Sequence, residues 1–147
     1  MESTLVIIKP DGVAHGLIGE IISRYEKARL SISALRIKNL SREAVEGFYA
    51  EHIRKDFFGR LVEFMSCGPS VLMVLYGENA VEAARMINGA TSPGEALPGT
   101  IRYDFALNER KNVVHSSDSP ESAKREIGYW FGKEEMATYS PHSFVCN

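Results

Sequence analysis

Residues 112–131 read NVVHSSDSPESAKREIGYWF, and this stretch decides the fold class of the chain. The two valines before His115 predict the end of a short strand, since β-branched residues favour extended structure. Ser119 and Pro120 then predict the start of a helix, because serine caps the free amides of a first turn and proline suits its first position. A strand that passes through a polar turn into an amphipathic helix indicates a sheet with helices packed on it.

The same alternation of strands and helices continues along the rest of the chain. Apolar runs predict strands over 4–8, 31–37 and 71–75, and helical spacing or caps predict helices over 17–25, 41–52, 57–65 and 80–87. Pro10-Asp11-Gly12 predicts a turn after the first strand, and Gly89 is expected to end its helix. The stretch from Gly89 to Arg110, interrupted by prolines and glycines, predicts a long irregular loop of the kind that is often functional.

The bulk properties favour a single domain spanning residues 1–147. The chain is 44% hydrophobic and 24% charged, which is ordinary for a soluble globular protein. Its formal net charge of −2 argues against a nucleic-acid binder with a broad basic surface, although a local cationic pocket is compatible with it. The first apolar run is too short for a membrane span or a signal peptide, so we expect a cytoplasmic protein without a membrane partner. Cys67 and Cys146 alone imply no disulfide framework.

Familiar nucleotide and metal motifs are absent from the sequence. It contains neither a P-loop nor a GxGxxG turn, and its scattered histidines and two cysteines do not form a Cys/His metal-binding motif. The histidines are His15, His52, His115 and His142. An isolated histidine is usually a surface or capping residue. His115 differs because it stands where a strand passes into a helix, so it can be held rigidly while its ring stays reachable.

Glu126 is the residue that could give His115 a partner. The buried stripe of its helix is predicted to be Ala123, Ile127, Trp130 and Phe131. Glu126 lies about 40° from the edge of that stripe at 3.6 residues per turn, so its carboxylate is partly turned inward. There it could fix the tautomer of His115 and leave the other ring nitrogen as a nucleophile. The alternative is a solvated carboxylate that pairs with Arg125 or Lys133.

The run from Asn112 to Ser119 closely resembles the active-site signature of nucleoside diphosphate kinases, Asn-x-x-His-Gly/Ala-Ser-Asp. Five further segments resemble that family in the same order: TLVIIKPDGV (4–13), GFYAEH (47–52), FFGRLVEFMSCGP (57–69), INGATSPGEALPGTIRYDFA (87–106) and SPESAKREIGYWF (119–131). The resemblance implies an α+β fold, the ferredoxin-like sandwich, in which helices pack on a four-stranded antiparallel sheet. It also implies a ping-pong enzyme that moves the terminal phosphate of a nucleoside triphosphate to a nucleoside diphosphate through a phosphohistidine.

The family pattern implies a role for individual residues of this sequence. His115 would accept the phosphate, with Glu126 and Ser117 holding and polarising its ring. Lys9 and Tyr49 would complete the catalytic set, with Tyr49 close to the histidine. The substrate, a ribo- or deoxyribonucleotide, would be bound by Lys9, Phe57, Leu61, Arg85, Thr91, Arg102 and Asn112. Lys9 and the arginines would meet phosphates, Phe57 and Leu61 the base, and Asn112 the sugar. Asp118 would contact, through water, a Mg²⁺ ion that the nucleotide brings.

Four positions depart from the family pattern. Ser116 stands where the family usually has glycine or alanine, and Tyr103 replaces a glycine. Glu109 and Arg110 occupy positions near the base that are usually apolar and glycine. These departures leave base preference open without affecting the phosphorylation chemistry. The resemblance further implies a homo-oligomer, for which we expect a hexamer with a tetramer as the alternative.

Two other classes of protein fit the sequence less well than this enzyme does. A non-catalytic nucleotide-binding or regulatory protein on the same fold would be expected to lose its nucleophile, whereas this sequence keeps the whole set of site residues. An RNA-binding module with a ferredoxin-like fold would need paired exposed aromatic side chains and a basic face. The sequence indicates neither.

Overall fold

The computed structural model describes residues 1–139 and 146, and within them one four-stranded antiparallel sheet forms the centre of the fold. Its strands are β1 Glu2–Ile8, β2 Ser31–Asn39, β3 Pro69–Gly77 and β4 Val114–Ser116. They lie in the order β2-β3-β1-β4, with every pairing antiparallel. The predicted fold class is confirmed. A single domain over residues 1–147 stays a prediction, and His142 lies outside the described residues.

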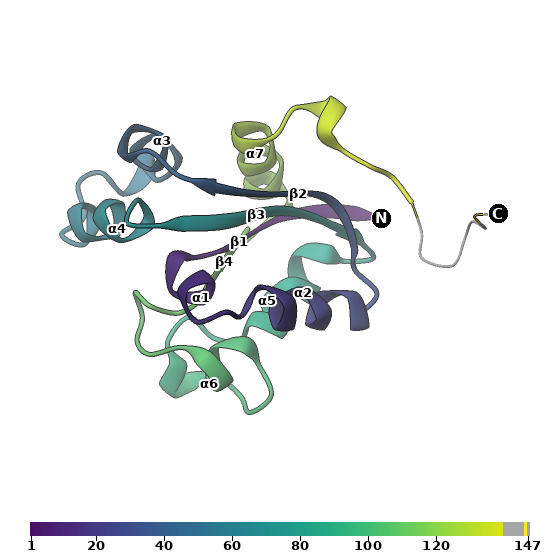
Figure 1. The fold of residues 1–147 in the computed structure, drawn as a ribbon, viewed down its shortest axis with the longest axis horizontal. Helices are drawn as coiled ribbons and strands as arrows, with labels where there is room; N and C mark the ends of the chain where they lie inside the picture. Colours follow the sequence, from purple (N-terminus) through teal and green to yellow (C-terminus); the bar gives the residue numbers. More distant parts are fainter. Residues whose placement is uncertain (140–145, 147) are drawn as a thin grey trace.

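Helices cover both faces of this sheet. They are α1 Pro10–Ala14, α2 Ile18–Lys27, α3 Arg42–Phe48, α4 Phe58–Met65, α5 Ala80–Asn88, α6 Ile101–Phe105 and α7 Pro120–Trp130, with short 3-10 helices η1 Ala50–His52, η2 Pro93–Glu95 and η3 Lys133–Glu135. Figure 1 shows α3 and α7 above the strands and α2, α5 and α6 below them. None of the described helices is long and apolar enough to cross a membrane.

The apolar run of β1 explains why both faces need a cover. Successive side chains of a strand point to opposite faces. Leu5 and Ile7 therefore pack into one core with α3, α4 and α7, and Val6 and Ile8 into a second core with α2, α5 and α6. All four side chains are fully buried. The sheet is thus the middle layer, and β4 lies at its edge beside β1.

Local helix signals are confirmed where they act within a few residues. The amide of Ala44 donates to the Ser41 hydroxyl at 3.1 Å, and the amide of Ser122 donates to the Ser119 hydroxyl at 3.1 Å. Gly89 ends α5 with a φ of 86°, which glycine adopts without strain. The helix expected to reach residue 52 instead ends at 48, and η1 continues it as a tighter turn.

The turn predicted at Pro10-Asp11-Gly12 is wrong, because α1 begins there. Lys9 is its N-cap, and the amide of Val13 donates to the Lys9 carbonyl at 3.1 Å. Proline is as well suited to the first position of a helix as to a turn, so the local signal is ambiguous. Packing decides between them: a Cβ on Gly12 would come within 2.8 Å of Ile8 and 3.1 Å of Val113, so glycine lets α1 lie close against the strand ends.

The wholly irregular loop predicted from Gly89 to Arg110 is also wrong in part. The stretch contains η2 and α6, and Thr100 caps α6 by accepting a hydrogen bond from the amide of Tyr103 at 3.3 Å. A five-residue helix completes little more than one turn, so it shows no apolar period in the sequence. This helix fixes the position of Arg102.

Candidate active site

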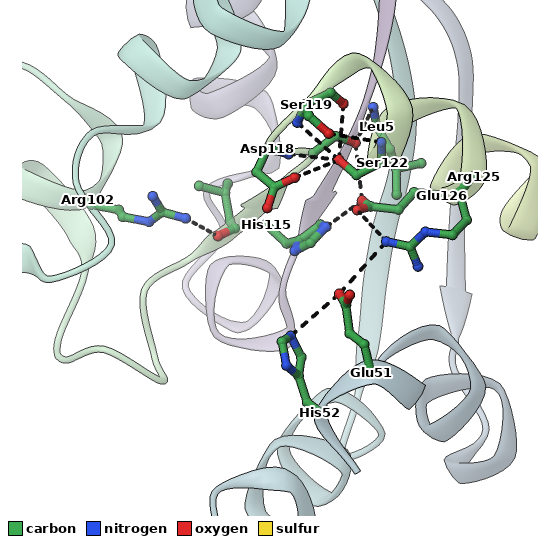
Figure 2. Close-up of polar contacts among 12 residues, drawn as sticks. Leu5, Glu51, His52, Arg102, His115, Asp118, Ser119, Ser122, Arg125 and Glu126 are labelled. Carbon is green, nitrogen blue, oxygen red and sulfur yellow. Dashed lines mark hydrogen bonds and ion pairs between the residues drawn. The ribbon is translucent and has the colours of Figure 1, made fainter. Parts of the chain in front are cut away.

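His115 lies on edge strand β4, opposite Ile7 of β1. Its Nε2 is 2.7 Å from Oε1 of Glu126, as Figure 2 shows. Because a carboxylate oxygen only accepts, Nε2 carries the hydrogen, and Nδ1 of a neutral ring keeps its lone pair. The rings of Phe48 and Tyr49 meet the imidazole edge-on, with centroids 5.4 and 5.9 Å away, and they restrict its rotation. The geometry therefore leaves Nδ1 as the ring nitrogen that the carboxylate does not occupy.

Glu126 is turned inward, as the helical wheel predicted. The residue is only 6% exposed, and its Oε1 also accepts a hydrogen bond from the buried Ser117 hydroxyl at 3.1 Å. The Ser119 cap starts α7 directly after β4, so the carboxylate comes back over the histidine eleven residues earlier. The alternative partner Arg125 is also present, at 3.9 Å from Oε2. The burial of Glu126 excludes a solvated carboxylate, but the predicted ion pair between Glu126 and Arg125 is present.

A cavity of about 560 Å³ opens in front of His115. Its lining contains the predicted residues Lys9, Tyr49, Phe57, Leu61, Arg85, Thr91, Arg102, Asn112, His115 and Asp118. Ser117 and Glu126 lie behind the histidine, and Glu126 lines a smaller chamber of about 210 Å³. The structure therefore brings together all the residues that the sequence singled out for the site.

Lys9 supplies a buried positive charge to this cavity. Its Nζ donates to the Asn112 Oδ1 at 2.8 Å, and the Asn112 amide donates in turn to the Thr91 carbonyl at 3.2 Å. Burial, with a smaller contribution from Arg102, lowers the pKa of Lys9 to about 8, and Asp11 offsets part of this effect. The buried ammonium group of Lys9 donates its hydrogen bond to a neutral amide and not to a carboxylate. It is therefore well placed to bind an anion.

The Arg102 guanidinium donates to backbone carbonyls and also lines the cavity. It donates to the carbonyls of Asn112 at 3.4 Å, Gly89 at 2.7 Å and Val114 at 2.8 Å. Arginine has five N–H donors, so two remain for a ligand in the cavity. Burial and the neighbouring Arg85 lower the pKa of Arg102. The side chain therefore ties the strand that carries His115 to the end of α5 and still faces the cavity with positive charge.

Two further side chains have a polar group suited to a ligand. The Tyr49 hydroxyl is buried without a hydrogen-bond partner in the described part of the chain, and burial raises its pKa, so it stays a neutral donor. The Asp118 carboxylate accepts a hydrogen bond from the Ser122 hydroxyl at 2.8 Å, which lowers its pKa and keeps it ionised. No group of three or more His, Cys, Asp or Glu side chains among the described residues is arranged to hold a metal.

His52 and Arg60 also line the cavity, and sequence reasoning missed both. The His52 ring lies between Tyr49 and Phe57, with centroid distances of 6.3 and 5.6 Å. Its Nδ1 is buried without a partner among residues 1–139. Spacing was the available signal, since His52 follows Tyr49 by three residues and lies on the same side of a helical turn.

Comparison with known proteins identifies one family. The family model described as nucleoside diphosphate kinase matches residues 2–136. A nucleoside diphosphate kinase of Methanosarcina mazei is 52% identical over 146 residues, covering 99% of this chain and 98% of that protein. One from Caldanaerobacter subterraneus is 59% identical over 131 residues, covering 89% and 94%. The solved structure of the Aquifex aeolicus nucleoside diphosphate kinase superposes with a TM-score of 0.90 at 42% identity, covering 92% and 99%. A family protein from Babesia bovis gives 0.92 at 41% identity, covering 97% and 96%.

Proposed function

This chain belongs to the nucleoside diphosphate kinase family, and from that premise we propose that the phosphate it transfers is carried on Nδ1 of His115. The enzyme moves the terminal phosphate of a nucleoside triphosphate to a nucleoside diphosphate. The single observation that carries the proposal is the 2.7 Å hydrogen bond between His115 Nε2 and Glu126. It commits one ring nitrogen to the carboxylate and leaves the other for attack.

Each half of the reaction then balances at His115. The Nδ1 lone pair attacks the terminal phosphorus, the bond to the bridging oxygen breaks, and the diphosphate leaves with that electron pair. Glu126 stabilises the positive charge that develops on the ring. A second diphosphate attacks the phosphohistidine through a terminal oxygen, and the electron pair returns to Nδ1. Lys9, Arg85 and Arg102 would stabilise the negative charge on the phosphate oxygens, because they line the same cavity.

The rest of the cavity supports the substrate roles. Phe57 is 49% exposed, so its ring can stack on a base, and Leu61 lies one helical turn away. Lys9 and Asn112 are joined by a 2.8 Å hydrogen bond, so both side chains would meet the same part of the sugar. One sugar hydroxyl is enough for this contact, so both ribo- and deoxyribonucleotides would be substrates. Thr91 would add a contact to phosphate.

A magnesium ion would enter this site with the nucleotide. Mg²⁺ is usually bound through one or two carboxylates, substrate phosphates and water. Two carboxylates of the described residues line the cavity, Asp118 and Glu109, and Glu109 accepts a hydrogen bond from the Ser92 hydroxyl. The hydrogen bond from Ser122 lowers the pKa of Asp118, so this carboxylate is ionised and fits an ion held mainly by the phosphates. When bound, the ion would withdraw electron density from the phosphate oxygens.

We also propose that the active species is a homo-oligomer, most simply a hexamer with a tetramer as the alternative, acting in the cytoplasm. Large apolar side chains are exposed along the 89–110 stretch: Leu97 at 73%, Tyr103 at 54% and Leu107 at 74%. Exposed apolar side chains gathered on one segment suggest a protein contact. The same stretch carries Thr91 and Arg102, so a neighbouring subunit that orders it would also order the phosphate site.

The covalent intermediate can be tested directly. The enzyme is incubated with ATP labelled in the γ-phosphate, without acceptor, and we expect label on the protein that is lost in acid, survives base and returns to added GDP. His115→Ala should remain unlabelled, while His15→Ala, which removes a histidine outside this cavity, should label like the wild type. Label on the His115→Ala protein would refute the assignment.

A further inference from the structure

The two oxygens of the Glu126 carboxylate have different neighbours. Oε1 accepts from His115 at 2.7 Å and from Ser117 at 3.1 Å. Oε2 lies 3.9 Å from Nη2 of Arg125, one residue earlier on α7. Figure 2 shows the guanidinium reaching the carboxylate from the side away from Arg102. The roles proposed above use Oε1 and do not explain what holds Oε2.

Arg125 also lies within ion-pair distance of a second carboxylate. The same Nη2 lies 3.8 Å from Oε1 of Glu51 on η1, and that oxygen lies 3.7 Å from Nε2 of His52. One guanidinium therefore bridges α7, which carries Glu126, and the segment between α3 and α4, which carries cavity residues. Figure 2 shows this chain of contacts from His52 to His115.

Stability does not account for this bridge. The side chains of Arg125 and Glu51 are 54% and 61% exposed, and exposed ion pairs contribute about 0–1 kcal/mol. The Glu126 side chain is only 7% exposed. The one buried group that the bridge touches is thus the carboxylate that holds the nucleophile.

We propose that Arg125 is a positioning residue for phosphate transfer: it anchors Oε2 of Glu126 and so keeps Oε1 directed at Nε2 of His115. This inference rests on the proposed roles of His115 and Glu126. The terminal torsion of a glutamate is broad, so a carboxylate with one oxygen free can rotate away from its partner. Anchoring the second oxygen restricts that rotation. Nε2 then remains the protonated nitrogen, and Nδ1 keeps the lone pair that attacks phosphorus.

A direct role in substrate binding is the competing explanation. Arg125 lines only the chamber of about 210 Å³, which adjoins the 560 Å³ cavity at His115, and it is not among the residues that line the cavity itself. Its loss should therefore affect the rate constant of phosphorylation and not the binding of the nucleotide. A slower phosphorylation with unchanged nucleotide binding therefore distinguishes a positioning role from a direct role in binding.

The test compares four variants in a single-turnover assay of His115 phosphorylation by ATP. Arg125→Gln should lower the maximal rate about 5- to 30-fold, with little change in the ATP concentration that gives the half-maximal rate. This loss is smaller than the roughly hundredfold loss that a misplacement of an ångström can cause. Arg125→Lys should recover most of the rate, because it restores a cation beside Oε2. Lys124→Gln is the matched control: it removes the same charge from an exposed neighbour on α7 and should leave the rate unchanged. Glu126→Gln should lower the maximal rate by about 10- to 1000-fold.

The ¹⁵N spectrum of the His115 ring gives a readout that a merely structural effect would not move. The wild type should show Nε2 protonated, and Arg125→Gln should shift the signals towards a mixture of tautomers. A wild-type rate and spectrum in Arg125→Gln, or a loss confined to nucleotide binding, would overturn this inference. If Glu126→Gln is slow in the same assay, the proposed function still stands. Wild-type turnover in both His115→Ala and Glu126→Gln would instead overturn the proposed function.

Discussion

Lys9 shows how burial changes a single ionisable group. It is the last residue before α1 and is only 8% exposed, yet its hydrogen-bond partner is the neutral amide of Asn112. Desolvation lowers its pKa from 10.5 to about 8. The group is therefore cationic at neutral pH but close to losing its proton, and a bound phosphate would favour the charged form.

This pKa predicts a pH dependence of activity. As pH rises through about 8, free enzyme loses the Lys9 charge, so kcat/KM for the donor nucleotide should fall well below the pH at which an ordinary lysine titrates. The effect of pH on stability has the opposite direction. The lysine of the unfolded chain has a pKa of 10.5 and binds its proton more tightly than the folded protein does. The Lys9 contribution to the free energy of unfolding therefore rises between pH 8 and 10.5.

A pH profile of kcat/KM checks this prediction, with Lys9→Arg as the control. Arginine keeps its charge across the range, so this variant should lack the alkaline fall near pH 8, whatever its absolute rate. If the fall persists at the same pH in Lys9→Arg, another group is responsible for it.

At the scale of elements, the wall that would meet the base joins the start of α4 to the segment after α6. Phe57 is the N-cap of α4, and Glu109 and Arg110 line the same cavity. The Ser92 hydroxyl donates to Glu109 Oε1 at 2.6 Å, which ties this segment to the residues before η2. The departure from the family pattern at Glu109 is thus part of the wall and not a free surface charge.

This wall predicts broad base choice. An aromatic face stacks on every base and reads few edges, so purine and pyrimidine nucleotides should differ in kcat/KM by less than about a thousandfold, or ~4 kcal/mol. Phe57→Ala should weaken binding of all of them by about 1–3 kcal/mol. A base-free donor such as tripolyphosphate should be insensitive to the change. A larger preference that Glu109→Val removes would show that edge recognition outweighs stacking.

At the scale of the whole molecule, segments that are distant in sequence meet at one end of the sheet. β4, the α3–α4 connection and the 89–110 stretch contribute to the 560 Å³ cavity, and α7 lines the adjoining chamber of about 210 Å³. Exposed apolar residues lie on that stretch, and Leu35 and Ile37 are 53% and 60% exposed on edge strand β2. An edge strand with exposed apolar side chains needs protection in a soluble protein, which association of identical subunits can supply.

Association predicts that mass and activity change together. Light scattering over a dilution series should give a hexamer, or a tetramer, whose dissociation lowers specific activity in the same samples. Pro98→Ser should shift both transitions to higher protein concentration, because losing proline increases the freedom of the unfolded stretch. A monomer with full activity at every concentration would contradict the prediction.

The sequence by itself determined the features whose signals are local. The caps at Ser41 and Ser119 form because the hydroxyl and the amide are three residues apart. The inward turn of Glu126 follows from helical periodicity, and the signature around His115 identified the family and, with it, the antiparallel sheet. Each of these inferences needs only neighbouring residues or a continuous motif.

Tertiary structure decided the features that depend on contacts between distant segments. Pro10 starts a helix because Gly12 fits under Val113, a contact that no local pattern specifies. The low pKa of Lys9 arises from burial by surrounding elements. Likewise, Arg125 comes within 3.8 Å of Glu51 only because the fold brings α7 and η1 together, although the two residues are 74 positions apart in the sequence. Desolvation and long-range ion pairs exist only after the chain has packed, so they could not be predicted from the order of the residues.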